Sequence, residues 1–130
     1  MLTISESRSD AALRVSEVGR DLVLLSWLGG DAARCGADPE RAYRELVRAL
    51  RERGCVPVQE RVFCDLSAAS AVAAGRARAL AAAGEQWPVP ATFVEGSPLE
   101  GRGVSGIHLI AARGRALTVA EGEKVFGTVV

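Results

Sequence analysis

Residues 38–54, DPERAYRELVRALRERG, have the pattern of one well-bounded amphipathic helix. Asp38 is a favourable N-cap, Pro39 suits the first helical position, and Gly54 is suited to end the helix. The apolar residues recur at the i, i+3, i+4 and i+7 spacing of a single helix face: Tyr43, Leu46, Val47 and Leu50. Because such a stripe must be buried against another element, we expect this helix to pack on one face of a sheet.

Strand-like segments lie on both sides of this helix. Weak alternation predicts a strand at 11–19 that ends at Gly19, and the apolar run at 21–30 predicts a buried strand. Residues 56–64, VPVQERVFC, alternate and predict a further strand, with Pro57 near its start or at a sheet edge.

The second half of the chain adds another helix and more strands. Ser67 is a candidate cap for an alanine-rich helix that runs to about Ala83, where Gly84 stops it. Residues 90–113 are expected to form a hairpin, and the tail ends in strand-like residues. The predicted order is β-β-α-β-α-β-β. We therefore expect one α+β domain over residues 1–130, in which two helices cover one face of a mixed sheet. An alternative is that this domain is one module of a longer tandem protein.

The charge balance argues against several classes of partner. The chain has 16 basic and 16 acidic residues and a formal net charge of zero, which removes the electrostatic case for a nucleic-acid or membrane partner. No apolar run approaches the roughly 20 residues that span a bilayer, and the N-terminus lacks a signal peptide's apolar stretch, so we expect a cytoplasmic protein. One histidine and three cysteines without C-x-x-C spacing predict reduced thiols and no metal or other cofactor.

The only histidine, His108, lies in the apolar segment GIHLIAAR. Strand alternation places Ile107, Leu109 and Ala111 on one face, and Gly106, His108 and Ile110 on the other. If the first face packs on the helices, His108 points away from the core into an interface, a cleft or solvent. A structural histidine is the favoured interpretation and a catalytic one the alternative, because no nucleophile-elbow pattern links His108 to a serine, and nothing places a base beside Cys64.

Four segments in this order resemble the RidA family, also called the YjgF family: DLVLLSW, RALRERG, ERVFCDLSAASAVAA and PVPATFVEG…GIHLIAAR. The resemblance covers about residues 10–113. It implies a chorismate-mutase-like α+β fold and a homotrimer that binds small ligands in clefts between subunits. Active members of that family hydrolyse reactive enamines and imines, such as 2-aminoacrylate, to 2-oxo acids and ammonia, and some carry an older description as endoribonucleases.

The family's catalytic residues do not carry over. Thr92 stands where the family has the arginine that clamps the substrate carboxylate, and a hydroxyl cannot supply a charged bidentate fork. Gly106 stands where the family has a water-positioning glutamate, and Ala73 lies near the position of its asparagine. Ser26 does match a serine that lines the family's cleft.

The resemblance and these departures lead to one expected function and one alternative. We expect a divergent RidA-like protein that binds a small anionic metabolite between subunits, in a site lined by the following residues: Ser26, Trp27, Thr92, Arg102, Gly106 and His108. The alternative is an enamine or imine deaminase, or another small-molecule hydrolase, with His108 as the acid–base group and Arg102 as the anion anchor.

Overall fold

The computed structural model describes residues 2–6, 12–28, 39–96, 104–114, 117–121 and 124–129. Its elements follow one another along the chain in this order: β1 (Leu2–Glu6), β2 (Ala12–Val18), β3 (Leu22–Leu28), α1 (Pro39–Arg53), β4 (Cys55–Cys64), the short 3₁₀ helix η1 (Leu66–Ala68), α2 (Ala69–Ala83), β5 (Ala91–Glu95), β6 (Val104–Arg113), β7 (Leu117–Glu121) and β8 (Lys124–Val129). The predicted helices and strands are all present, and β1 is an additional strand that the polar N-terminal sequence did not indicate. Neither α1 nor α2 is long and apolar enough to cross a membrane.

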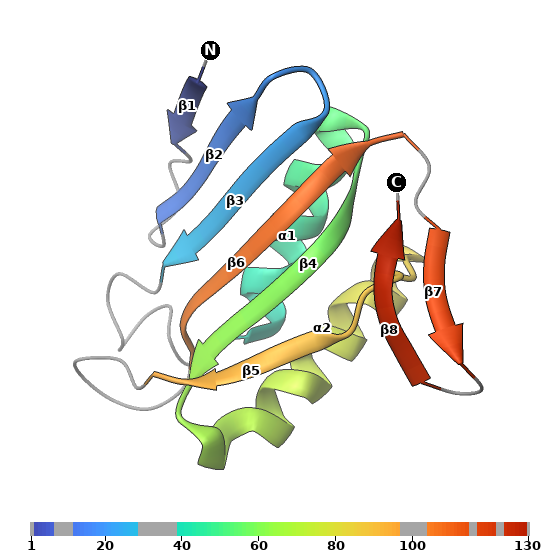
Figure 1. Cartoon of the computed structure of the whole chain (residues 1–130). Coiled ribbons are helices and arrows are strands. Elements are labelled where there is room, and N and C mark those ends of the chain that lie inside the picture. The colour runs from blue at the N-terminus through green and yellow to red at the C-terminus, as the bar shows by residue number, and fades with distance from the viewer. Residues whose placement is uncertain are drawn as a thin grey trace.

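Six strands form one mixed sheet in the order β1-β2-β3-β6-β4-β5. Neighbouring strands are antiparallel except for β4 and β5, which are parallel. Both helices lie behind this sheet in Figure 1, on one of its two faces. The predicted α+β class with two helices on one face is thus confirmed. A separate two-stranded sheet, β7–β8, lies with β8 beside β4.

The predicted hairpin over residues 90–113 is wrong. β5 and β6 do not pair with each other, because β4 lies between them and pairs with both. The connection from β4 through α2 to the parallel strand β5 is a β-α-β crossover, which returns the chain to the sheet on the far side of β4.

The helix boundaries follow local sequence chemistry. Gly54 and Gly84 follow the last residues of α1 and α2 with φ angles of 61° and 67°, a left-handed conformation that residues with a Cβ rarely adopt. The predicted cap at Asp38 lies outside the described residues. The predicted cap at Ser67 is wrong: the Asp65 carboxylate accepts hydrogen bonds from the Ser67 backbone N–H at 3.0 Å and from the Ser67 hydroxyl at 2.9 Å, so Asp65 caps η1, and α2 continues directly from it.

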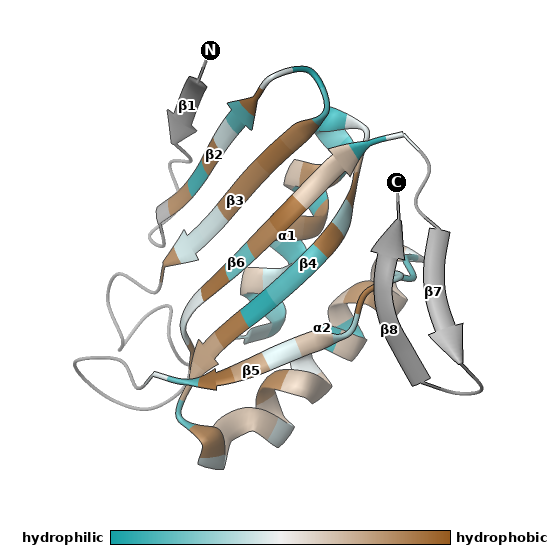
Figure 2. Ribbon diagram, viewed as in Figure 1, coloured by the Kyte–Doolittle hydropathy of each residue, from teal (hydrophilic) through white to brown (hydrophobic). Residues whose placement is uncertain are grey.

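The core lies between the sheet and the helices. Along β3 the burial alternates: Val23, Leu25 and Trp27 are buried toward the helices. Leu22, Leu24 and Leu28 lie on the opposite face and are 42%, 39% and 41% exposed. The predicted buried strand is therefore buried on its helix-facing side alone, since its apolar residues occupy both faces. Figure 2 shows the apolar run of β3 and, on the other side of β6, the hydrophilic middle of β4.

Candidate functional site

One row of polar side chains crosses the face of the sheet that the helices leave uncovered, called the open face below. Cross-strand pairing places Arg14 of β2 opposite Ser26 of β3, Ser26 opposite His108 of β6, His108 opposite Arg61 of β4, and Arg61 opposite Thr92 of β5. Directly paired residues on adjacent strands point to the same face. The fold therefore gathers residues from five strands into one line.

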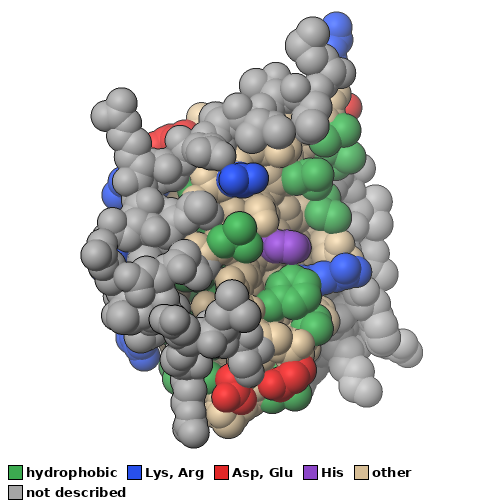
Figure 3. All heavy atoms as spheres, turned by 90° about the vertical axis from the view of Figure 1, so that its left-hand side faces the viewer, with side chains coloured by type: hydrophobic (Ala, Val, Ile, Leu, Met, Phe, Trp, Pro, Cys, Tyr) green, Lys and Arg blue, Asp and Glu red, His purple; other side chains and the backbone are tan. Residues whose placement is uncertain are grey.

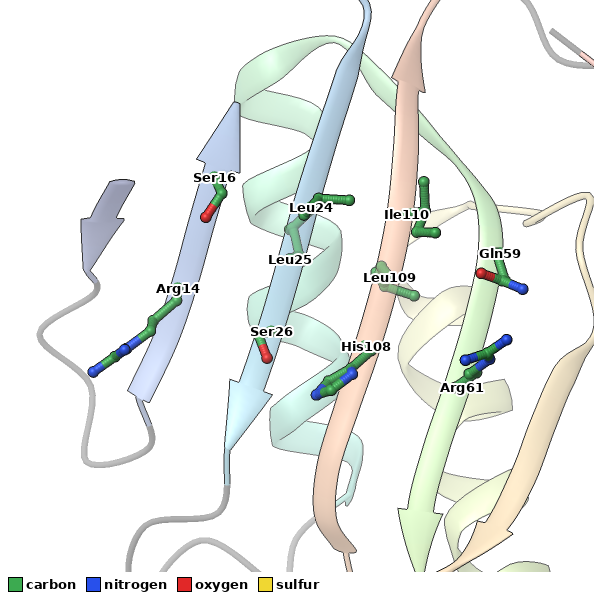
Figure 4. A pocket seen from close by; sticks show the side chains of 10 residues that line it. All are labelled: Arg14, Ser16, Leu24, Leu25, Ser26, Gln59, Arg61, His108, Leu109 and Ile110. Carbon is green, nitrogen blue, oxygen red and sulfur yellow. The ribbon is translucent and has the colours of Figure 1, made fainter. Parts of the chain in front are cut away.

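A hollow of about 420 Å³ surrounds the middle of this row. We call it the central hollow, and the following residues line it: Arg14, Ser16, Leu24, Leu25, Ser26, Gln59, Arg61, His108, Leu109 and Ile110. In Figure 4 Ser26 and His108 point toward one another, Arg61 lies on the other side of His108, and the Arg14 side chain runs away from it. In Figure 3 the histidine lies in the middle of the side shown, beside hydrophobic side chains and with Lys or Arg side chains on two sides.

Arg61 is the feature of this hollow with the clearest chemical meaning. Its side chain is exposed, and it forms no ion pair with any carboxylate in residues 13–28, 39–96 and 104–114. Five N–H donors in a planar fork make an arginine well suited to bind a carboxylate. Arg61 is thus a cation that is available to a ligand, next to the only histidine.

A second, smaller hollow of about 230 Å³ adjoins His108. We call it the Phe63 hollow, and its lining is Leu28, Phe63, Gly96, Ser105, Gly106 and His108. The rings of Phe63 and His108 are tilted by 60° with their centroids 5.0 Å apart, a favourable edge-to-face arrangement. Because His108 lines both hollows, they meet at the imidazole.

The predicted site residues divide into three groups. His108 is exposed on the open face while Ile107, Leu109 and Ala111 are buried, so the predicted alternation of this strand is confirmed. Ser26, Gly106 and Thr92 belong to the same face, although Thr92 lines neither hollow. Arg102 lies outside the described residues.

Trp27 is placed elsewhere, and the prediction that it lines the site with Ser26 is wrong. Its side chain is 2% exposed, and its indole N–H donates a 3.2 Å hydrogen bond to Glu45 of α1. The reason is the period of a β-strand: Trp27 directly follows Ser26, so the two side chains point to opposite faces. Trp27 is a core residue of the helix side.

Arg61 is absent from the site that the sequence predicts, in which Arg102 is the expected cation. A signal was present in the alternation of VPVQERVFC. If Val62 and Cys64 face the helices, then Arg61 and Phe63 face the other way, and both of these side chains do line the hollows. Only the pairing of β4 with β6 reveals that they lie beside His108.

The described residues give little evidence for a reactive thiol or a metal site. Cys55 and Cys64 are free and buried, and burial raises the pKa of both thiols, which disfavours the nucleophilic thiolate. Across the residues searched, no three His, Cys, Asp or Glu side chains gather in a group that could hold a metal ion.

The other charged cluster lies on the helix side of the sheet, away from both hollows. The Glu60 carboxylate is 1% exposed and accepts a 2.6 Å hydrogen bond from the Tyr43 hydroxyl and bonds of 2.9–3.2 Å from the Arg76 guanidinium. Arg76 also donates to the Val89 carbonyl at 3.2 Å and lies over the Trp87 ring, 5.5 Å from its centroid. These groups pair with one another between α1, α2 and the sheet, so they link the layers and leave no group directed at a ligand.

Comparisons with known proteins support the fold. The sequence matches no family model and no curated protein. The structure is similar to that of a chorismatase, with a TM-score of 0.67 and 16% sequence identity. The match covers 88% of this chain and 37% of the chorismatase, so this chain spans well under half of that protein's length. It is also similar to a protein from Salmonella typhimurium proposed to be a translation initiation inhibitor, with a TM-score of 0.51 and 15% identity, over 86% of this chain and 99% of that one. The chain has the chorismate-mutase-like α+β fold that these two structures share.

Proposed function

We propose that this protein binds a small carboxylate metabolite in the central hollow, with Arg61 as the anion contact and His108 and Ser26 beside it. The observation that carries the proposal is the position of Arg61, an exposed guanidinium without a carboxylate partner among residues 13–28, 39–96 and 104–114, directly opposite the only histidine. The size of the hollow, about 420 Å³, falls within the range of roughly 300–1,000 Å³ of small-molecule sites.

The chemistry around Arg61 suits a carboxylate of this kind. Arg61 supplies the charge, and His108 and the Ser26 hydroxyl on the neighbouring strands supply further hydrogen-bonding groups. The resemblance to the RidA family points to 2-oxo acids and their enamine or imine precursors as the metabolite class. The proposed contact differs from the family arrangement because the cation comes from β4, whereas Thr92 occupies the family's arginine position on β5.

A second copy of the chain is proposed to close the hollow, within a homotrimer. Four large aliphatic side chains of the open face are 39–42% exposed: Val18, Leu22, Leu24 and Leu28. Exposed apolar sheet faces of this kind are usually buried by association, and a formal net charge of zero does not oppose it. A hollow on one subunit would then become a cleft between two.

A catalytic variant of this proposal rests on His108. An exposed imidazole next to a carboxylate-binding arginine is suitably placed for acid–base chemistry on a bound imine or enamine. Addition of solvent water to the imine carbon, followed by cleavage of the C–N bond, would give a 2-oxo acid and ammonia. Because Thr92 and Gly106 replace two residues of the family machinery, activity on 2-aminoacrylate is expected to be weak. Ammonia release that is lost in His108→Ala would favour the catalytic variant, and release that is unchanged in His108→Ala would exclude His108 as its acid–base group.

The experiment that tests the binding proposal compares two charge-neutralising variants. We would titrate the protein calorimetrically with 2-oxobutyrate and, as a neutral analogue, with 2-oxobutyramide. Losing one charge-assisted contact costs about 1.5–3 kcal/mol, so Arg61→Gln should weaken 2-oxobutyrate binding by roughly tenfold to more than a hundredfold. The control Arg48→Gln removes an arginine on α1 that is also exposed, and it should leave binding unchanged. Equal binding of acid and amide, or equal loss in both variants, would refute the proposal.

A further inference from the structure

We infer that the ligand carries a flat apolar group the size of one aromatic ring, which occupies the Phe63 hollow while its carboxylate contacts Arg61. The inference rests on the proposed function and names the class of ligand more narrowly: an aryl-substituted 2-oxo acid. The evidence for it is the Phe63 hollow, the residues that line this hollow, and the position of His108, where the Phe63 hollow meets the central hollow.

The Phe63 hollow exists because a strand residue has no side chain. A Cβ atom at Gly106 would make ordinary van der Waals contacts, 3.5 Å from the Leu28 side chain that lines the hollow and 3.4 Å from the Trp27 carbonyl oxygen. A larger side chain there would occupy the hollow itself. The hollow has a volume of about 230 Å³ and is open to solvent along much of its surface, so a bound ring would have one side against the protein.

The lining of this hollow favours a flat apolar group over a polar one. Phe63 and Leu28 supply apolar surface, and the His108 ring supplies a second aromatic edge. The Ser105 hydroxyl lies 3.0 Å from the Phe63 carbonyl oxygen and 2.5 Å from the Gly96 carbonyl oxygen, so its single proton is donated within the protein. An incoming ring would therefore meet aromatic and aliphatic surfaces.

The spacing of Arg61 and Phe63 suits a single small ligand that carries both a carboxylate and a ring. Arg61 and Phe63 are two residues apart on β4 and both line hollows on the open face, so their Cα atoms are separated by about 6–7 Å. A short chain between a carboxylate and a ring spans such a distance. His108 lies between the two contacts, opposite Arg61 and in ring contact with Phe63.

The test compares 2-oxobutyrate with 2-oxo-4-phenylbutyrate, which differ by one phenyl ring. The quantity measured by calorimetric titration is the ratio of their dissociation constants. In the unmodified protein the phenyl compound should bind at least about tenfold more tightly. In Gly106→Val, whose side chain fills the hollow, the ratio should fall to near one. Phe63→Leu, which keeps apolar volume but removes the flat ring, should lower the ratio by severalfold and serves as the second variant should Gly106→Val fail to fold.

Two results would overturn the inference. If both compounds bind with equal affinity and binding still depends on Arg61, the ring site is refuted while the carboxylate site stands. If the phenyl compound keeps its full advantage in Gly106→Val and in Phe63→Leu, the ring binds elsewhere. Failure of both compounds to bind would refute the proposed function together with this inference.

Discussion

Arg61 on β4 and His108 on β6 are directly paired across two antiparallel strands and both line the same hollow on the open face of the sheet. They are 47 positions apart in the sequence and are joined only by strand register. The pairing places a cation beside the histidine, while Thr92 lies opposite Arg61 on β5. The exposed polar row thus lies on the open face, and the buried ion pair of Glu60 and Arg76 lies on the helix side.

The buried ion pair of the helix side should be costly to break. Removal of Arg76 leaves the Glu60 carboxylate, 1% exposed, without its charged partner. Arg76→Ala should lower the free energy of unfolding by about 3–5 kcal/mol, because an unpaired buried charge is left behind. Arg78→Ala is the matched control: Arg78 is 60% exposed in its pair with Glu40, and its loss should cost at most about 1 kcal/mol. Urea unfolding measures both, and equal losses would contradict the assigned role of Arg76.

Tyr43 should make the protein less stable at alkaline pH. Burial, followed by the nearby negative charge of Glu60, raises the pKa of Tyr43 well above its usual value. Above about pH 10 the tyrosine ionises in the unfolded chain but stays protonated in the folded one, so the unfolded state is favoured as the pH rises. The stability advantage of the unmodified protein over Tyr43→Phe should fall by about 1.4 kcal/mol between pH 9 and pH 11. A difference that does not change over this range would show that Tyr43 is not shielded as described.

Gly75 of α2 lies close against the first residues of α1. A Cβ atom there would lie 2.9 Å from Cγ of Pro39 and 3.0 Å from the backbone nitrogen of Glu40. Helix propensity alone favours alanine over glycine by about 1 kcal/mol, but overpacking costs about 1–3 kcal/mol. Gly75→Ala should therefore be destabilising by up to about 2 kcal/mol in thermal or urea unfolding. A gain in stability would show that the helices separate freely at this point.

The open face should mediate self-association. Light scattering should give three times the 13.6 kDa of the single chain at micromolar concentration. Leu22→Glu places a charge on this face at a residue that is 42% exposed and lines neither hollow, and it should yield monomers with unchanged helix content. The control Leu66→Glu alters a residue on η1 that is 51% exposed and should leave the mass unchanged. A monomeric mass for the unmodified protein would contradict the proposed trimer.

Local patterns in the sequence predicted the elements well. The apolar stripe of α1, the glycines that end both helices and the alternation around His108 are properties of a few neighbouring residues, and the structure confirms each of them. The α+β class follows from the order of these elements. Such features depend on local spacing, so one sequence suffices to predict them.

The same local patterns did not predict which strands pair when they lie far apart in the sequence. The chain from 90 to 113 has the spacing of a hairpin, yet β4 inserts between its two strands, which only the register of β4 with both neighbours specifies. The apolar run of β3 fits a strand buried on both faces, because hydrophobicity does not tell a helix-covered face from one left open. Arg61 was overlooked because its neighbour across the sheet, His108, lies far away in the sequence.

The single histidine gives the most direct measurement of the central claim. Because His108 is the only histidine of the chain, its imidazole resonances are unambiguous in a nitrogen-15 NMR spectrum. Titration with 2-oxobutyrate should shift these resonances in a saturable manner, and 2-oxobutyramide should not. In Arg61→Gln the same shift should need at least about tenfold more 2-oxobutyrate. Imidazole resonances that stay in place while calorimetry detects binding would put the carboxylate site elsewhere on the protein and contradict the account.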